Sequence, residues 1–142
     1  MAAPERVFVD TNVFLRYLTN DVPKQADAVE RLLRRAGAGE VVLVTGILVI
    51  AEIVWTLESF YKLSRVDIQE KVRAIINTPG LEVYERIVIS QAVSDYVDRN
   101  VDFVDAYNAS WMLAQGIRSV RTFDRRHFSR FDSLEVREPN GA

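Results

Sequence analysis

The fold is decided by Arg6-Val7-Phe8-Val9-Asp10-Thr11-Asn12, a β-branched and aromatic run that ends in three polar side chains. Such a run predicts a strand over residues 6–10. Similar runs predict further strands over residues 41–45, 81–85 (after a Pro-Gly turn), 117–123 and 134–137.

Amphipathic or apolar segments lie between these runs. Residues 21–36 open with Asp21 and Pro23, carry apolar side chains at helical spacing and stop at Gly37, which predicts a helix. Further helices are predicted over residues 47–61, from Ser64 to a point before Pro79, over 90–99 and over 102–115. The 47–61 segment is apolar almost all round, which is typical of a helix packed deep against a sheet. Strands that alternate with helices indicate an α/β fold whose mostly parallel sheet is covered on both faces.

Length and composition bound the class of protein. A chain of 142 residues with 49% hydrophobic and 27% charged residues predicts one folded domain over residues 1–142. No stretch is long and apolar enough to cross a bilayer, and residues 1–6 lack the apolar core of a signal peptide. The sequence contains 0 cysteines, which fits a reducing compartment. We therefore expect a cytoplasmic protein. The formal net charge is -2, so the chain lacks the excess of basic residues that is typical of nucleic-acid-binding proteins. This counts against a nucleic-acid substrate.

Four acidic residues follow predicted strands or lie within predicted helices: Asp10, Glu52, Asp105 and Asp124. Ligands of open α/β sheets bind beyond the carboxyl ends of the strands, and Asp10 and Asp124 would face that crevice. Carboxylates that converge there repel one another unless protons or a hard cation intervene. This pattern indicates a divalent-metal site.

Each acid also has a purely structural interpretation. Asp10 would equally well cap a helix, because Asp accepts hydrogen bonds from free backbone N–H groups. Glu52 is surrounded by apolar residues, so we expect it to be buried and to need either a cation or an Arg partner. Asp102 lies one helical turn before Asp105 and could be a cap only. Asp95 is expected on a solvated surface.

Thr122-Phe-Asp124 repeats the strand-end pattern, and three arginines follow it: Arg125, Arg126 and Arg130. Arginines beside an acidic crevice could hold phosphate oxygens, or they could pair with nearby acids in a solvated loop. His127 is the single histidine, and its neighbours favour a packing or surface role over that of a ligand.

Taken in order, four short motifs resemble the PIN-domain family, in particular its VapC ribonuclease toxins. The motifs are Val9-Asp-Thr-Asn12, Ala51-Glu-Ile-Val-Trp55, Asp102-Phe-Val-Asp-Ala106 and Thr122-Phe-Asp-Arg125. The resemblance implies a three-layer α/β/α sandwich, cleavage of single-stranded RNA, a homodimer, and inhibition by a cognate VapB-like antitoxin. It also implies that Asp10, Glu52, Asp105 and Asp124 bind Mg²⁺ or Mn²⁺, with Asn12 and Thr122 as supporting groups and Asp102 as an auxiliary acid.

The leading hypothesis is therefore hydrolysis of an RNA phosphodiester by a water activated on one or two divalent ions. A structure-selective DNA nuclease of the same fold is the nearest enzymatic alternative. A binding module whose acids only hold a structural ion is the non-enzymatic one. A phosphatase would need a second acid where Asn12 stands.

Overall fold

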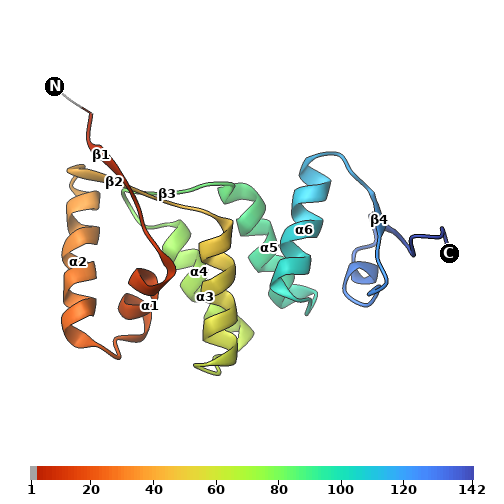
Figure 1. The fold of residues 1–142 in the computed structure, drawn as a ribbon, viewed down its shortest axis with the longest axis horizontal. Coiled ribbons are helices and arrows are strands. Elements are labelled where there is room, and N and C mark those ends of the chain that lie inside the picture. The colour runs from red at the N-terminus through yellow and green to blue at the C-terminus, as the bar shows by residue number, and fades with distance from the viewer. Residues whose placement is uncertain (1–2) are drawn as a thin grey trace. The chain divides into compact units, whose positions relative to one another are not determined.

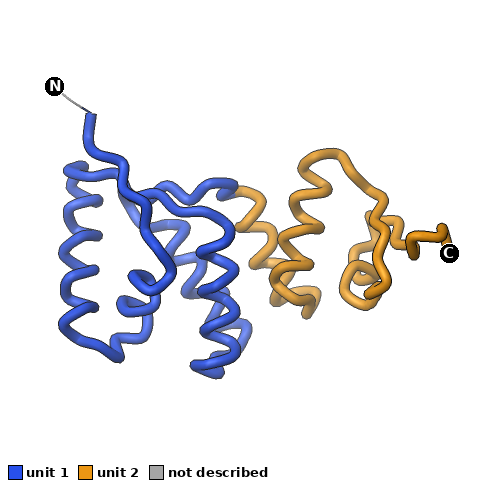
Figure 2. The backbone as a smooth tube through the Cα atoms, in the orientation of Figure 1, with its two compact units in different colours: residues 1–86 blue, residues 87–142 orange. Residues whose placement is uncertain are grey.

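A computed structural model describes residues 3–142. These residues form two compact units, an N-terminal unit up to Arg86 and a C-terminal unit from Ile87 to Ala142 (Figure 2). The elements are, in chain order, β1 (Glu5–Phe8), α1 (Thr11–Thr19), α2 (Pro23–Gly37), β2 (Val41–Thr45), α3 (Ile47–Ser59), α4 (Arg65–Ile76), β3 (Leu81–Val83), α5 (Arg86–Asp98), α6 (Phe103–Ala114), β4 (Ser119–Arg121), the 3₁₀ helix η1 (Phe128–Arg130) and β5 (Glu135–Arg137).

Three parallel strands form the sheet of the N-terminal unit, in the order β1-β2-β3 (Figure 1). The register places Val7 opposite Leu43, and Leu43 opposite Leu81. In the central strand β2, Val41, Leu43 and Thr45 are buried. The carboxyl ends of β1 and β2 lie at the same edge of this sheet because the two strands are parallel.

The helices of the N-terminal unit bury aliphatic stripes. The fully buried positions of α3 and α4 are Ile50, Ile53, Leu57, Ile68 and Val72. Burying a side chain of this size removes enough apolar surface from water to contribute about 1.5–3 kcal/mol. Within residues 3–142 no helix has both the length and the apolar composition needed to span a membrane.

The predicted α/β class with parallel strands is confirmed, since all strand pairings within residues 3–142 are parallel. β2 covers the predicted residues 41–45, whereas the other strands are shorter than predicted. The Ser64 hydroxyl accepts a hydrogen bond from the Asp67 N–H at 3.1 Å, which confirms the predicted start of α4. Helix α1 and η1 were not predicted. Asp10 was a candidate cap, but the nine residues of α1 carry no acidic residue in the first turn to extend that signal.

The C-terminal unit packs α5 and α6 and pairs β4 with β5 in parallel, with Val120 opposite Val136. The rings of Tyr96 and Phe103 meet edge to face with centroids 6.2 Å apart, an arrangement that aromatic pairs prefer. Residues 122–134 connect β4 to β5 and contain η1 as their only regular element.

Asp21, just after α1, ties this end of the helix to the residues that follow α3. Tyr61 Oη donates to Asp21 Oδ2 at 2.7 Å, and Thr19 Oγ1 donates to Asp21 Oδ1 at 2.9 Å. These two hydrogen bonds, that from Tyr61 first, lower the pKa of Asp21 from its ordinary value of 3.8. A lowered folded-state pKa means that the stabilisation is present above pH 3.8 and is lost as the pH falls through the folded-state pKa.

We expect Tyr61→Phe to raise the pKa of Asp21 toward 3.8, because the largest of the interactions that lower it is removed. An NMR titration of the Asp21 carboxyl carbon in both proteins measures this shift. If the two titration curves coincide, the Tyr61 hydroxyl has no part in stabilising the Asp21 carboxylate.

Candidate active site

Asp10 lies between β1 and α1 and caps the helix. Its Oδ1 accepts a hydrogen bond from the Thr11 N–H at 2.8 Å, so the capping interpretation is confirmed. Within residues 3–142 no other hydrogen bond engages this exposed carboxylate, which leaves Oδ2 available. Capping and metal binding are therefore compatible at Asp10. Asn12 lies exposed in the first turn of the same helix.

Thr11, next to Asp10, carries an unsatisfied polar atom. Thr11 is 7% exposed, and its Oγ1 atom has no hydrogen-bond partner within residues 3–142. Leaving a buried hydroxyl unpaired costs roughly 1–3 kcal/mol. A polar ligand at this strand end would remove that cost.

Glu52 is exposed, and the prediction that it is buried is wrong. Helix α3 buries the stripe Val49, Ile50, Ile53, Val54 and Leu57. The opposite face carries Glu52 together with Leu48, which is 78% exposed, and Trp55, which is 68% exposed. The helix is therefore not buried on all sides, and the argument that desolvation forces a partner on Glu52 does not hold. That Glu52 takes part in the site does not depend on its burial and stays a prediction.

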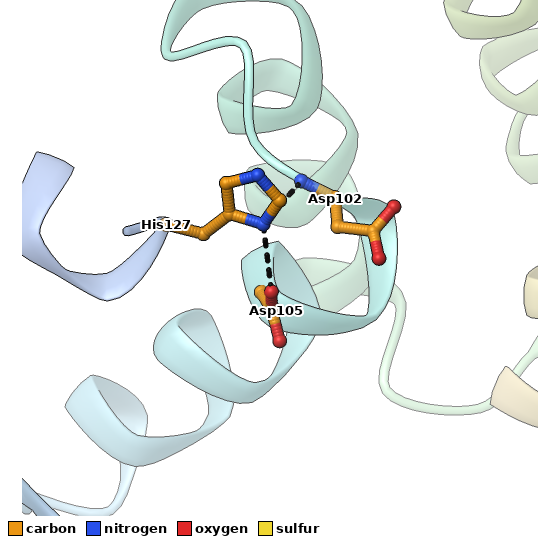
Figure 3. Close-up of side chains that lie close together, drawn as sticks. All are labelled: Asp102, Asp105 and His127. Atoms are coloured by element: carbon orange, nitrogen blue, oxygen red, sulfur yellow. Dashed lines mark hydrogen bonds and ion pairs between the residues drawn. The ribbon is translucent and has the colours of Figure 1, made fainter. Parts of the chain in front are cut away.

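Asp102, Asp105 and His127 form a cluster in the C-terminal unit (Figure 3). One potential ligand atom from each lies within 4.8 Å of the others. His127 Nδ1 is 2.8 Å from Asp105 Oδ2. Asp102 occupies the N-cap position of α6 but makes no side-chain capping bond, so the cap interpretation of Asp102 is wrong. Asp105, in the first turn of α6, has a side chain that is 25% exposed.

Asp124 and Thr122 form a local turn after β4. The Thr122 Oγ1 accepts from the Asp124 N–H at 3.0 Å, and Asp124 Oδ1 accepts from the Arg126 N–H at 3.4 Å. Thr122 therefore fixes the backbone that carries Asp124, in keeping with a supporting role. The Asp124 side chain is exposed.

Two of the three arginines bind to backbone carbonyls of the C-terminal unit. Arg125 Nη2 donates to Val136 O at 3.2 Å, and Arg130 Nη1 donates to the carbonyl of Asn100. Arg126 is exposed, and within residues 3–142 its guanidinium has no such partner. Arg126 is consequently the arginine of this loop best able to meet a phosphate without breaking an existing contact.

From the sequence, His127 was expected to have a packing or surface role and was not predicted to belong to the site. The sequence feature that could have indicated its place in the site is its position three residues after Asp124, in a loop that follows a strand end. The structure places Asp10 and Glu52 in the N-terminal unit, and Asp102, Asp105 and Asp124 in the C-terminal unit. Carboxylate oxygens suit a hard divalent ion, so the side chains of Asp102 and Asp105 fit such an ion.

Comparison with known proteins identifies the family of this chain. The family model described as "PIN domain" matches residues 7–134. The chain is 30% identical over 118 residues to a VapC ribonuclease of Aquifex aeolicus (strain VF5), covering 83% of this chain and 87% of that protein. The residues matched by the family model include all the predicted site residues, from Asp10 to Arg130. This chain therefore belongs to the PIN domain family and is a relative of VapC ribonuclease.

Proposed function

We propose that this chain is a divalent-metal-dependent endoribonuclease that cleaves single-stranded regions of RNA and acts as the toxin of a toxin–antitoxin pair. The observation that carries the proposal is the cluster of Asp102, Asp105 and His127, whose polar side-chain atoms lie within 4.8 Å of one another, in a chain related to a VapC ribonuclease. Fold alone would not assign an activity, because one fold hosts many functions.

The proposed roles of these residues are those that the resemblance to the PIN-domain family implies. Asp10, Asp105 and Asp124 are the proposed ligands of Mg²⁺ or Mn²⁺, and Glu52 is a ligand or orients the attacking water. Asn12 and Thr122 support them, and Asp102 is auxiliary. These residues would hold a divalent ion, which would supply a water of lowered pKa and positive charge to neutralise the leaving oxygen. Mg²⁺ uses only one or two carboxylates directly, so four acids need not all touch it.

The arginines supply the positive charge that the chain lacks overall. With a net charge of -2, attraction to RNA has to be local. Arg126 would contact the phosphate nearest the acids, while Arg125 and Arg130 would contribute from positions held by backbone carbonyls.

Metal removal tests this proposal. We expect the purified full-length chain to cleave single-stranded RNA in Mg²⁺ or Mn²⁺, to lose all cleavage in excess EDTA, and to regain it when metal is added. Gel electrophoresis of labelled RNA measures the cleavage. Flapped duplex DNA is the comparison substrate. Preferential cleavage of the flap would favour the DNA nuclease, and calorimetric Mn²⁺ binding without cleavage of either would favour the non-catalytic module.

We propose a homodimer in the cytoplasm and a VapB-like antitoxin that covers the acids with a segment carrying a basic side chain. Co-expression and pull-down with the product of the adjacent upstream reading frame test the partner. Failure to form a stable complex contradicts it without affecting the nuclease proposal.

A further inference from the structure

His127, the single histidine of the chain, contacts the first turn of α6. We propose that His127 is a positioning residue: its Nδ1–H holds Oδ2 of Asp105 and so aims Oδ1 at a divalent ion. The inference rests on the proposed function, in which Asp105 is a metal ligand. His127 would belong to the metal site without itself binding the ion.

Two groups approach the Nδ1 atom of His127 (Figure 3): Asp105 Oδ2 at 2.8 Å and the Asp102 N–H at 3.4 Å. A ring nitrogen either donates or accepts, so it cannot serve both groups. An ionised carboxylate only accepts, and 2.8 Å is the length of a strong, charge-assisted bond, whereas 3.4 Å is long for a hydrogen bond. Nδ1 therefore carries the hydrogen and donates it to Asp105.

This bond is shielded from water and fixes one oxygen of Asp105. The side chains of His127 and Asp105 are 14% and 25% exposed. No other hydrogen bond within residues 3–142 engages the Asp105 carboxylate, which leaves Oδ1 for a ligand. Ligating carboxylates are generally held by outer hydrogen-bond donors of this kind, which reduce the number of orientations that they sample.

The backbone that carries His127 is itself held in place. Arg99 Nη1 donates to Arg130 O at 2.9 Å, and Arg130 in turn donates to the carbonyl of Asn100. The Arg99 guanidinium also lies over the Phe131 ring, 4.7 Å from its centroid, and its Nε pairs with the buried Asp95 at 3.0 Å. These contacts join η1 and Phe131, which follow His127, to the segment that precedes α6.

Two substitutions separate positioning from the other roles that a histidine could have. The Asn side-chain nitrogen is bonded to Cγ, as Nδ1 is in His, so His127→Asn can still donate to Asp105. The Gln nitrogen lies one bond further out, near the place of Nε2, so His127→Gln cannot. A histidine that bound metal through Nε2 would show the opposite preference, and one needed only for stability would affect folding in both variants.

The experiment measures Mn²⁺ affinity by calorimetry on the full-length wild type and on both variants, with the melting temperature of each. We expect His127→Asn to stay within about 3-fold of the wild-type Kd and His127→Gln to weaken it by roughly 10- to 100-fold, the usual effect of losing an outer hydrogen bond to a ligand. Equal affinities of the two variants, or better binding by Gln than by Asn, would overturn the proposal.

A measurement on the wild type guards against a variant that does not fold. Because the chain has one histidine, its long-range ¹H–¹⁵N correlation spectrum reports His127 alone. We expect the tautomer with hydrogen on Nδ1, both before and after addition of Mg²⁺. The Nε2–H tautomer, or a ring nitrogen whose shift shows direct coordination, would refute the positioning role.

Neither readout requires catalysis. A wild type that binds Mn²⁺, shows the expected order of variants and cleaves no RNA would defeat the proposed function and leave His127 as the residue that orders the ion site. A wild type that cleaves RNA while the two variants bind Mn²⁺ equally would defeat only the positioning role.

Discussion

Asp10→Asn is expected to fold like the wild type and to lose RNA cleavage. The Asn amide oxygen can accept the 2.8 Å hydrogen bond from the Thr11 N–H that Asp10 Oδ1 accepts, so the cap of α1 is kept. What is lost is one negative charge, which a hard cation requires of its ligands. We expect cleavage to fall by roughly 100-fold or more, since changing even an outer partner of a ligand typically costs 10- to 100-fold.

The measurement is the rate of cleavage of labelled RNA in Mg²⁺, together with the melting temperature. Asp27→Asn is the matched control, because Asp27 is exposed on α2 and the substitution removes the same charge. Asp10→Ala would lose activity and, in addition, about 1 kcal/mol of capping free energy. An Asp10→Asn protein as active as the Asp27→Asn control would remove Asp10 from the mechanism.

Gly80→Ala is expected to have the largest effect on stability. Gly80, in the turn before β3, has φ +81°, and a Cβ there would meet the carbonyl of Ala36 and lie 2.8 Å from the Ala36 Cβ. A left-handed conformation costs a non-glycine residue about 1–2 kcal/mol, and forcing extra atoms into packed structure adds about 1–3 kcal/mol. We expect a total of about 3 kcal/mol or more in the free energy of unfolding from urea titrations.

Gly39→Ala provides the control for backbone conformation. Gly39 has φ +80°, almost the value of Gly80, but no atom lies within 4 Å of its Cβ position. This variant should lose only about 1–2 kcal/mol, the conformational part. Similar losses in the two variants would show that the contact with Ala36 relaxes at little cost.

Local features of the sequence were enough to predict most of the elements. The β-branched run of residues 41–45 gave the bounds of β2, and Ser64 gave the start of α4, because each depends on a few adjacent residues. The Pro79-Gly80 turn is present for the same reason, and the Leu81 N–H closes it by donating to Thr78 O at 3.2 Å. The order of strands and helices then restricted the fold to the α/β class.

The predictions that failed concern which way side chains face. Glu52 was expected to be buried because its neighbours are apolar, but the buried stripe of α3 leaves it on the open face. Asp95 was expected in solvent, yet it is 7% exposed and paired with Arg99. The bond between His127 and Asp105 joins residues 22 positions apart. Such contacts depend on the packing of separate elements, which no local pattern contains.

The short path from β4 to β5 limits how this part of the site can evolve. A connection between parallel strands needs about a dozen residues, usually including a helix, and residues 122–134 make it with one 3₁₀ turn. The segment holds Thr122, Asp124 and His127, so the same residues must both span the distance and present the polar groups. Because this connection has little length to spare, we expect a deletion within residues 122–134 to disturb either the pairing of β4 with β5 or the placement of these polar groups. We therefore expect relatives to vary this segment by exchanging side chains more often than by changing its length.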